Sequence, residues 1–289
     1  MSSFDTRHRT TLVDGREVFY REAGDPSRPT VVLLHGFPTS SHMFRNLMPA
    51  LADEYHLIAP DHIGFGRSES PTVDEFDYSF DHLAEVTVSL LGQLGVDRFA
   101  LYVHDYGAPI GLRIAAEHPE RVTALITQSG NAYREGFTPF WDVLFAHAGD
   151  REAHEPAVRE LLDVAATRWQ YTHGVPDDRL DRIAPETWLT DQAGLDRPGN
   201  KEIQLQLFWD YQFNLDRYPL FQEYFRTHRP PTLVAWGRDD EIFGSAGAEA
   251  FAADLPDAEI HLLDTGHFAL ETHLDEIAGL MRDFLRRTA

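Results

Sequence analysis

The chain has 289 residues, of which 43% are hydrophobic and 25% charged, with a formal net charge of −22 and no cysteine. This composition supplies a sizeable core, and the lack of cysteine excludes disulfides and thiolate metal sites and favours a reducing, cytoplasmic compartment. The negative charge disfavours nucleic acid and anionic membranes as partners. The polar start Met1–Asp5 does not look like a signal peptide, and no apolar run reaches the roughly 20 residues of a membrane helix.

Short β-branched and apolar runs alternate with longer helical patterns, which predicts a mainly parallel sheet flanked by helices. Helices are expected over residues 44–53, 81–94 and 107–117 and over the C-terminal stretch from Ile277 to Leu285, because apolar side chains recur there at helical spacing. The expected strands are Val18–Arg21, Val31–Leu34, His56–Ala59, Phe99–Val103, Ala124–Gln128, Thr232–Trp236 and Glu259–Leu263.

The strand rhythm stops after Asn131 and resumes near Pro230. The intervening stretch has no convincing buried strand and is rich in aromatic residues at helical spacing. We therefore expect two domains, a sheet domain formed by residues 1–131 and 228–289 and a helical cap formed by residues 132–227. The cap should lie over the carboxyl ends of the strands, where open α/β sheets bind their ligands.

Asp105 carries the strongest local signal. An apolar strand leads directly into it through Val103-His104, and a helix follows after Gly107-Ala108. This is the form of a nucleophile elbow, in which small residues allow a sharp turn that lifts the nucleophile above the sheet. A carboxylate at this position needs no base to activate it and can form an ester with a saturated carbon. Taken alone, Asp105 could equally be a helix N-cap.

Two later strands end in residues that suit a base and its orienting acid. The strand ending at Trp236 is followed by Gly237-Arg238-Asp239-Asp240, and the strand ending at Leu263 is followed by Gly266-His267. A histidine base needs an acid to fix its tautomer. The order nucleophile, acid, histidine therefore predicts the set Asp105, Asp240 and His267, with Asp239 as the rival acid. Ser68 lacks a preceding apolar strand and is interpreted as structural.

Together these motifs resemble the α/β-hydrolase superfamily over nearly the whole chain, and within it the branch of epoxide hydrolases and haloalkane dehalogenases. The resemblance implies an α/β-hydrolase fold, a two-step reaction through an ester on Asp105, and water activation by His267. It also implies an oxyanion hole formed by the backbone N–H groups of Phe37 and Tyr106. His35-Gly36-Phe37-Pro38 matches the His-Gly-x-Pro turn of epoxide hydrolases.

The enzymes of this branch differ in the leaving group that they release. Haloalkane dehalogenases typically hold the halide with a Trp after the nucleophile and an Asn or another Trp, and this chain has Tyr106 and Phe37 at the two matching positions. Epoxide hydrolases use cap tyrosines to protonate the epoxide oxygen, a role for which Tyr211 and Tyr171 are the candidates. We therefore expect an epoxide hydrolase, although Tyr106 replaces the usual Trp of that family too.

The alternatives are a haloalkane or haloacid dehalogenase with an atypical halide site, built from Trp141, Trp169 or Tyr211, and a ligand-binding protein that has kept the fold. The intact set of Asp105, Asp240 and His267 counts against a pure binder. No metal or organic cofactor is expected, because the Asp and His positions lack metal-ligand spacing. The expected partners are water and a small, largely apolar organic substrate, and a homodimer is left open.

Overall fold

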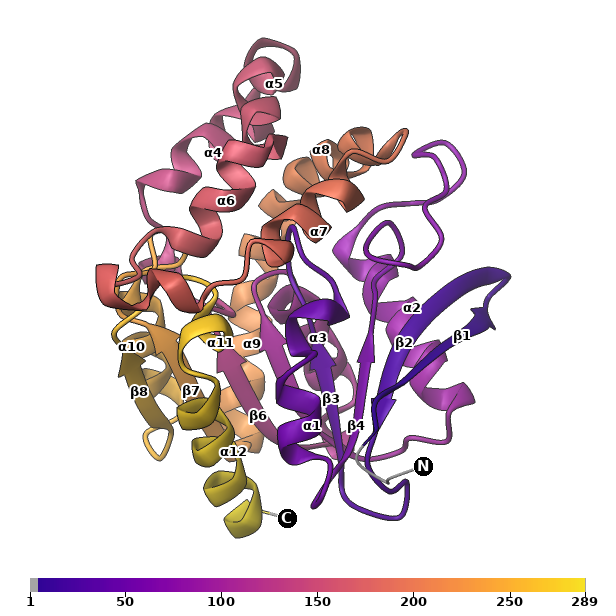
Figure 1. The fold of residues 1–289 in the computed structure, drawn as a ribbon, viewed down its shortest axis with the longest axis vertical. Helices are drawn as coiled ribbons and strands as arrows, with labels where there is room; N and C mark the ends of the chain where they lie inside the picture. The colour runs from indigo at the N-terminus through magenta and orange to yellow at the C-terminus, as the bar shows by residue number, and fades with distance from the viewer. Residues whose placement is uncertain (1–4, 289) are drawn as a thin grey trace.

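The computed structural model describes residues 5–288. Its centre is an eight-stranded sheet in the order β1-β2-β4-β3-β5-β6-β7-β8 (Figure 1). β2 runs antiparallel to β1 and β4, and the pairs from β4 to β8 are parallel. The strands are β1 Arg7–Val13, β2 Arg16–Ala23, β3 Thr30–Leu34, β4 His56–Pro60, β5 Phe99–His104, β6 Val122–Gln128, β7 Thr232–Gly237 and β8 Glu259–Leu263.

Twelve α-helices accompany the sheet in the described part of the chain. They are α1 Leu47–Leu51, α2 Phe80–Gln93, α3 Gly107–Glu117, α4 Asp142–Gly149, α5 Arg151–Arg159, α6 Val164–Thr172, α7 Glu186–Leu195, α8 Asn200–Asp210, α9 Asn214–His228, α10 Ser245–Asp254, α11 Ala269–Thr272 and α12 Leu274–Thr288. All seven expected strands and all four expected helices are present, and the α/β-hydrolase fold is confirmed. The unexpected elements include β1 and α10.

Strand β1 escaped prediction because most of its side chains are exposed, so it shows neither a buried apolar run nor a clean alternation. It is an edge strand that extends the sheet by pairing antiparallel with β2. Alanine makes up half of helix α10, whose one large buried side chain is Phe251, so its apolar periodicity is weak.

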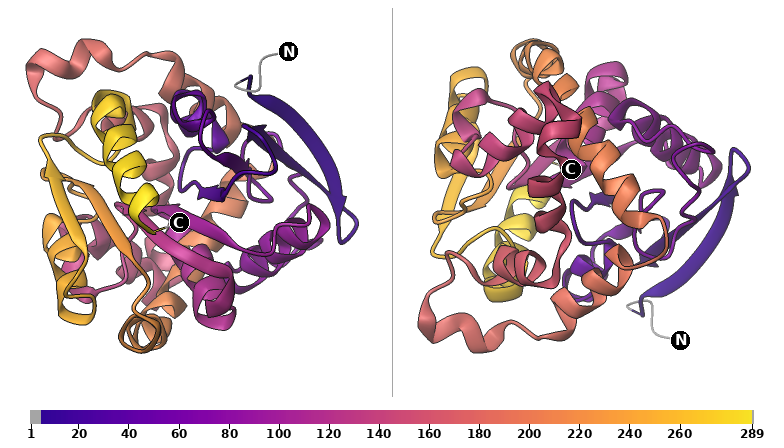
Figure 2. Two further views of the ribbon diagram at one scale, coloured as in Figure 1. Left: turned by 90° about the horizontal axis from the view of Figure 1, so that it is seen from below. Right: turned by 90° about the horizontal axis from the view of Figure 1, so that it is seen from above.

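The parallel strands are buried on both faces, and alternate side chains of β3 show this directly. Val31 and Leu33 belong to the hydrophobic cluster that contains α1 and α12, whereas Val32 and Leu34 belong to the cluster that contains α2, α3 and α9. Figure 2 shows the resulting layers, with helices on either side of the sheet. Because helices cover both faces, a ligand is expected to approach the sheet at the carboxyl ends of its strands.

Helices α4 to α8 lie above this edge, between β6 and β7 in the chain (Figure 1). They occupy most of the segment predicted to be the cap. The last helix of that range, α9, behaves differently, because it packs beside α3 and α10 in the layer that covers the sheet. The two-domain division therefore stays a prediction, with α9 on the side of the core.

The residues Met1–Phe4, which entered the expectation that the chain has no signal peptide, lie outside the described residues. Within residues 5–288, no helix combines the length and the apolar character that a bilayer-spanning segment requires.

Candidate active site

Asp105 occupies the sharp turn between β5 and α3. Its φ is +49°, in the left-handed region that few residues other than glycine adopt. The turn is tight because a Cβ on Gly107 would stand 2.2 Å from the carbonyl oxygen of Leu34, so only glycine fits there. The backbone at Asp105 is therefore strained, and this conformation presents the carboxylate at the carboxyl edge of the sheet, as the elbow motif predicts.

The loop after β3 holds one oxygen of that carboxylate. The backbone N–H of Phe37 donates to Asp105 Oδ1 at 2.6 Å, and the backbone amide of Tyr106 also acts on the carboxylate and lowers the pKa of Asp105. A Cβ on Gly36 would lie 2.3 Å from the Asp105 side chain, so glycine is required for this approach. The two amides predicted to form an oxyanion hole therefore converge on Asp105.

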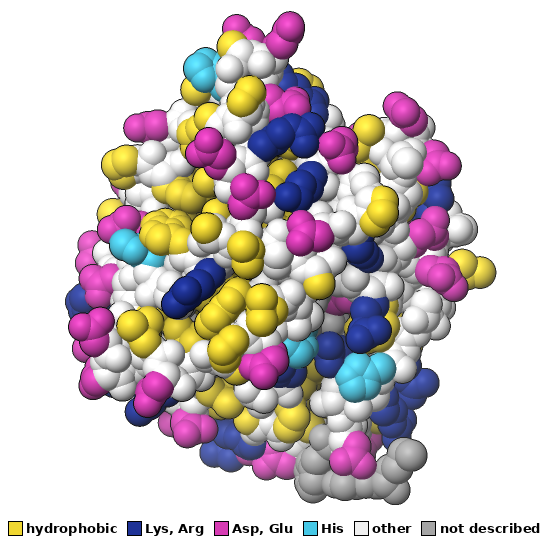
Figure 3. Space-filling view, turned by 45° about the horizontal axis from the view of Figure 1, so that its top comes forward, with side chains coloured by type: hydrophobic (Ala, Val, Ile, Leu, Met, Phe, Trp, Pro, Cys, Tyr) yellow, Lys and Arg dark blue, Asp and Glu magenta, His cyan; other side chains and the backbone are white. Residues whose placement is uncertain are grey.

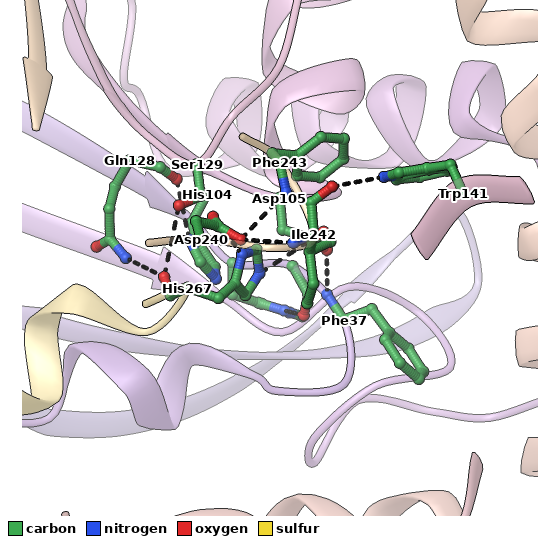
Figure 4. A network of polar contacts seen from close by, with 12 residues as sticks. Phe37, His104, Asp105, Gln128, Ser129, Trp141, Asp240, Ile242, Phe243 and His267 are labelled. Atoms are coloured by element: carbon green, nitrogen blue, oxygen red, sulfur yellow. Dashed lines mark hydrogen bonds and ion pairs between the residues drawn. The ribbon is translucent and has the colours of Figure 1, made fainter. Parts of the chain in front are cut away.

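His267 and Asp240 form a buried pair beside Asp105 (Figure 4). His267 Nδ1 lies 2.9 Å from Asp240 Oδ2, and the other oxygen of Asp240 accepts the backbone N–H groups of Ile242 and Phe243 at 2.8 and 3.1 Å. These bonds fix the carboxylate, which in turn orients the imidazole. The rival acid Asp239 is exposed, whereas the Asp240 side chain is fully buried.

The remaining nitrogen of His267 faces Asp105. Nε2 lies 3.9 Å from Asp105 Oδ2, too far for a hydrogen bond, and within the described chain it has no hydrogen-bond partner. Burial alone would lower the pKa of His267, but the carboxylates of Asp240 and Asp105 more than offset burial and raise that pKa above its usual value. A base with one nitrogen committed and the other free can take a proton from a water molecule placed between it and Asp105.

Burial raises the pKa of Asp105 to about 6, against the opposing effects of His267 and the amides of Phe37 and Tyr106. The adjacent N-terminus of α3 would by itself favour the ionised form of this carboxyl. The structure shows that desolvation outweighs the favourable charges, because the Asp105 side chain is only 6% exposed. At neutral pH the carboxylate is still the majority form.

Aromatic rings surround this group. Tyr106 lies with its ring centroid 5.9 Å from those of Phe37 and Tyr211, and the Tyr211 ring is 4.3 Å from Trp141. The Tyr211 hydroxyl lies 3.5 Å from that of Tyr218. The Tyr106 hydroxyl is buried and has no hydrogen-bond partner among the described residues. Sequence reasoning assigned Tyr106 only a backbone role, since nothing in a single sequence shows that a phenol lacks a partner.

The other cap candidates have their polar atoms bound or lie apart from Tyr211. The Trp141 indole N–H donates to the carbonyl of Ile242 at 2.8 Å, which leaves it no donor for a halide. Trp169 stacks on Phe140 and His173 and lines a separate hollow on the surface.

Tyr171 is engaged elsewhere as well. Its hydroxyl donates to Asp191 at 2.5 Å, and its ring stacks on Phe268 at 3.9 Å. The Tyr171 proton is therefore already committed to a carboxyl group, unlike the proton of Tyr106.

The two remaining residues of the His-Gly-x-Pro turn do not present donors to Asp105. His35 Nδ1 lies 2.9 Å from the Gly36 carbonyl, and Nε2 accepts the backbone N–H of His62 at 3.1 Å, so this imidazole fastens the loop. Pro38 lines a hollow whose lining does not include Asp105. Ser68 accepts the N–H of Phe19 and donates to the Asp61 carbonyl, which confirms its structural role.

Comparison with known proteins places this geometry in context. The family model described as alpha/beta hydrolase fold matches residues 29–274. An uncharacterized hydrolase of Saccharomyces cerevisiae, YNR064C, is 45% identical over 276 residues, which cover 94% of each chain. A haloalkane dehalogenase of Mycolicibacterium paratuberculosis is 43% identical over 112 residues, 38% of this chain and 37% of that protein.

The solved structures add the epoxide hydrolase CorEH, which superposes with a TM-score of 0.77 at 21% identity over 99% of this chain and 100% of its own. At 21% identity this similarity is evidence for the fold alone. In the described part of the chain, no group of three or more His, Asp or Glu side chains lies close enough together to hold a metal ion.

Proposed function

The chain belongs to the α/β-hydrolase family, and from that premise we propose that it hydrolyses small, largely apolar epoxides to diols through an ester on Asp105. The proposal rests on the different surroundings of the two carboxylate oxygens of Asp105. Oδ1 of Asp105 accepts the Phe37 amide, while Oδ2 faces the unpartnered Nε2 of His267. One oxygen is held and the other is available to a substrate.

In the first step, Asp105 Oδ2 attacks an epoxide carbon, the carbon–oxygen bond of the ring breaks, and the released oxygen takes a proton from a tyrosine hydroxyl. In the second step, water attacks Cγ of the ester while His267 Nε2 takes its proton. The Phe37 and Tyr106 amides stabilise the negative charge that develops on Oδ1. The ester bond then breaks, the leaving oxygen takes the second proton of the attacking water, and the diol departs. The proton held by His267 restores the tyrosine.

The tyrosines favour an epoxide over a halide. An epoxide oxygen leaves as an alkoxide, a poor leaving group that gains from a proton donor, whereas a halide needs only hydrogen bonds. Tyr106 and Tyr211 are two buried phenols on which the charge of Asp105 acts, and the Tyr106 hydroxyl has no competing partner in residues 5–288. The second candidate function is dehalogenation, which the local match to a mycobacterial haloalkane dehalogenase favours.

A substrate panel separates these two candidates. We expect terminal and internal epoxides of small hydrocarbons to give diol, and chloro- and bromoalkanes of the same carbon skeleton to release halide at least about tenfold more slowly, since the indole N–H of Trp141, which packs against Tyr211, already donates to Ile242. Diol is measured by gas chromatography and halide by ion chromatography. Faster halide release than diol formation would favour dehalogenation.

The second test concerns the proton donors. Tyr106→Phe and Tyr211→Phe should each slow formation of the alkyl-enzyme on an epoxide, and the double variant by about 10²–10⁴-fold, because general-acid help is worth that much. Hydrolysis of the ester should change little. Rapid-quench measurements of single turnovers separate the two steps.

Tyr224→Phe is the matched control, because that hydroxyl is also buried without a partner in the described chain but belongs to α9. Tyr171→Phe should act like the control on the alkylation step, since its hydroxyl is held by Asp191. If the double variant alkylates at the parent rate, the tyrosines serve only in packing.

A further inference from the structure

A hollow lies beside the loop that follows β3, where Pro38, Thr39 and Ser40 belong to its lining. Its volume is about 380 Å³, and three arginines line it. Arg21 comes from β2, Arg67 from the turn after β4, and Arg197 from the turn after α7. The wall is therefore shared between the sheet domain and the segment above it. Figure 3 shows, right of centre, Lys and Arg side chains gathered beside His side chains on this face.

The three guanidinium groups make no ion pair within the described residues. Arg21 contacts the Ser41 hydroxyl at 3.1 Å and the His8 ring at 2.8 Å, and Arg197 donates to two backbone carbonyls, those of Gly194 and Gly64. The exposed Arg67 has no side-chain hydrogen bond in residues 5–288. The nearby Arg45, in contrast, is paired with Glu271 through two bonds.

The two carboxyl groups in the lining make their hydrogen bonds to groups other than these guanidinium groups, although the charge of Asp61 still acts on Arg21 and Arg197. Asp61 accepts the backbone N–H groups of Ser41 and Arg67 at 2.8 and 2.7 Å. Asp191 accepts the Tyr171 hydroxyl, and burial raises the pKa of Asp191 to about 7, so much of it is neutral at physiological pH.

The positive charges of these arginines also repel one another. Burial lowers the pKa of Arg21, and the nearby guanidinium groups of Arg67 and Arg45 lower it further. The charge of Asp61 offsets only part of this decrease. The three arginines share one hollow without an ion pair in the described residues, and a bound anion would relieve the repulsion between their charges.

We propose that this hollow is a binding site for a small oxyanion, a carboxylate or phosphate group, held between Arg21 and Arg67 of the core and Arg197 of the upper segment. Guanidinium groups present planar forks of N–H donors that match both kinds of oxyanion. Because the site draws on both sides of the boundary, the bound anion fastens the upper segment to the sheet domain. Neither Asp105 nor His267 takes part in the binding.

Equilibrium dialysis and calorimetry with inorganic phosphate and with malonate test the proposal. Both are run at one ionic strength set with sodium chloride, because salt screens exposed charges. We expect saturable binding of one anion with a dissociation constant below about 1 mM. Arg67→Gln and Arg197→Gln should each weaken binding about tenfold, the effect of losing one charge-assisted contact.

Arg238→Gln serves as the matched control, since it removes one exposed arginine that pairs with Asp264 outside the hollow, and it should bind as the parent does. Asp105→Ala should also retain the site. Saturation by phosphate alone assigns a phosphate group, and saturation by malonate assigns a carboxylate. The proposal is overturned if neither probe saturates, if both hollow variants bind like the parent, or if Asp105→Ala abolishes binding.

Discussion

Asp105→Ala is expected to lower turnover of every substrate by more than about 10⁴-fold, because it removes the carboxylate proposed to form the ester. The Phe37 amide and the His267 imidazole remain in place, but neither can substitute for the missing oxygen. Steady-state assays on epoxides measure the loss. Asp239→Ala, which removes an exposed carboxylate next to Asp240, should keep the parental rate. An active Asp105→Ala enzyme contradicts the proposed chemistry outright.

The same variant should remain folded and unfold no more easily than the parent. Burial raises the pKa of Asp105 to about 6, above the value of about 3.9 in an unfolded chain. Between those pH values the native state binds more protons, so stability falls as pH rises through the window. The shift of about two units corresponds to roughly 3 kcal/mol of destabilisation by the ionised carboxylate at neutral pH.

Alanine removes that penalty and loses the hydrogen bond from Phe37, so the two effects partly cancel. Thermal unfolding of parent and variant at pH 7.5 and at pH 5 checks the sign, since any advantage of the variant should shrink at the lower pH. A variant that is strongly destabilised at pH 7.5 would show that the buried charge is better compensated than its surroundings indicate.

His267→Gln is expected to form the ester and then stop. The first step needs only the ionised Asp105, whereas the second needs a base at Nε2, and loss of a general base costs about 10²–10⁴-fold. Intact-protein mass spectrometry after substrate addition should show one stable adduct. Peptide mapping should place the adduct on Asp105.

The double variant Asp105→Ala/His267→Gln is the control and should gain no mass. A His267→Gln enzyme that neither turns over nor accumulates adduct would mean that His267 acts before the ester forms. Both outcomes are read on the protein itself, so they do not depend on the rate of the uncatalysed reaction.

The parts of this structure that the sequence predicted share one physical property. Strands such as Val31–Leu34 and Phe99–Val103 are buried on both faces, so their apolar runs are continuous and easily recognised. The loops that follow such strands meet at one edge of a parallel sheet, which is why Asp105, Asp240 and His267 could be grouped before their distances were known.

The rest depended on partners that are distant in the chain. The sequence offers Trp141 as a halide donor and Tyr171 as an acid. In the structure the Trp141 N–H donates to the Ile242 carbonyl, and the Tyr171 hydroxyl donates to Asp191. An aromatic residue in an aromatic-rich segment has the same local pattern whether its polar atom is free or bound. Only the packed structure shows that Tyr106 keeps a free hydroxyl among the described residues.

The placement of the site across β5, β7 and β8 has a consequence for how the protein acquires activity as it folds. The Asp105 turn is local, but the imidazole reaches it only after β7 has paired with β6 and β8 with β7. Such long-range pairings form slowly because they close large loops. A refolding chain should therefore regain helical signal well before it regains turnover, and enzyme activity becomes a reporter of the completed sheet.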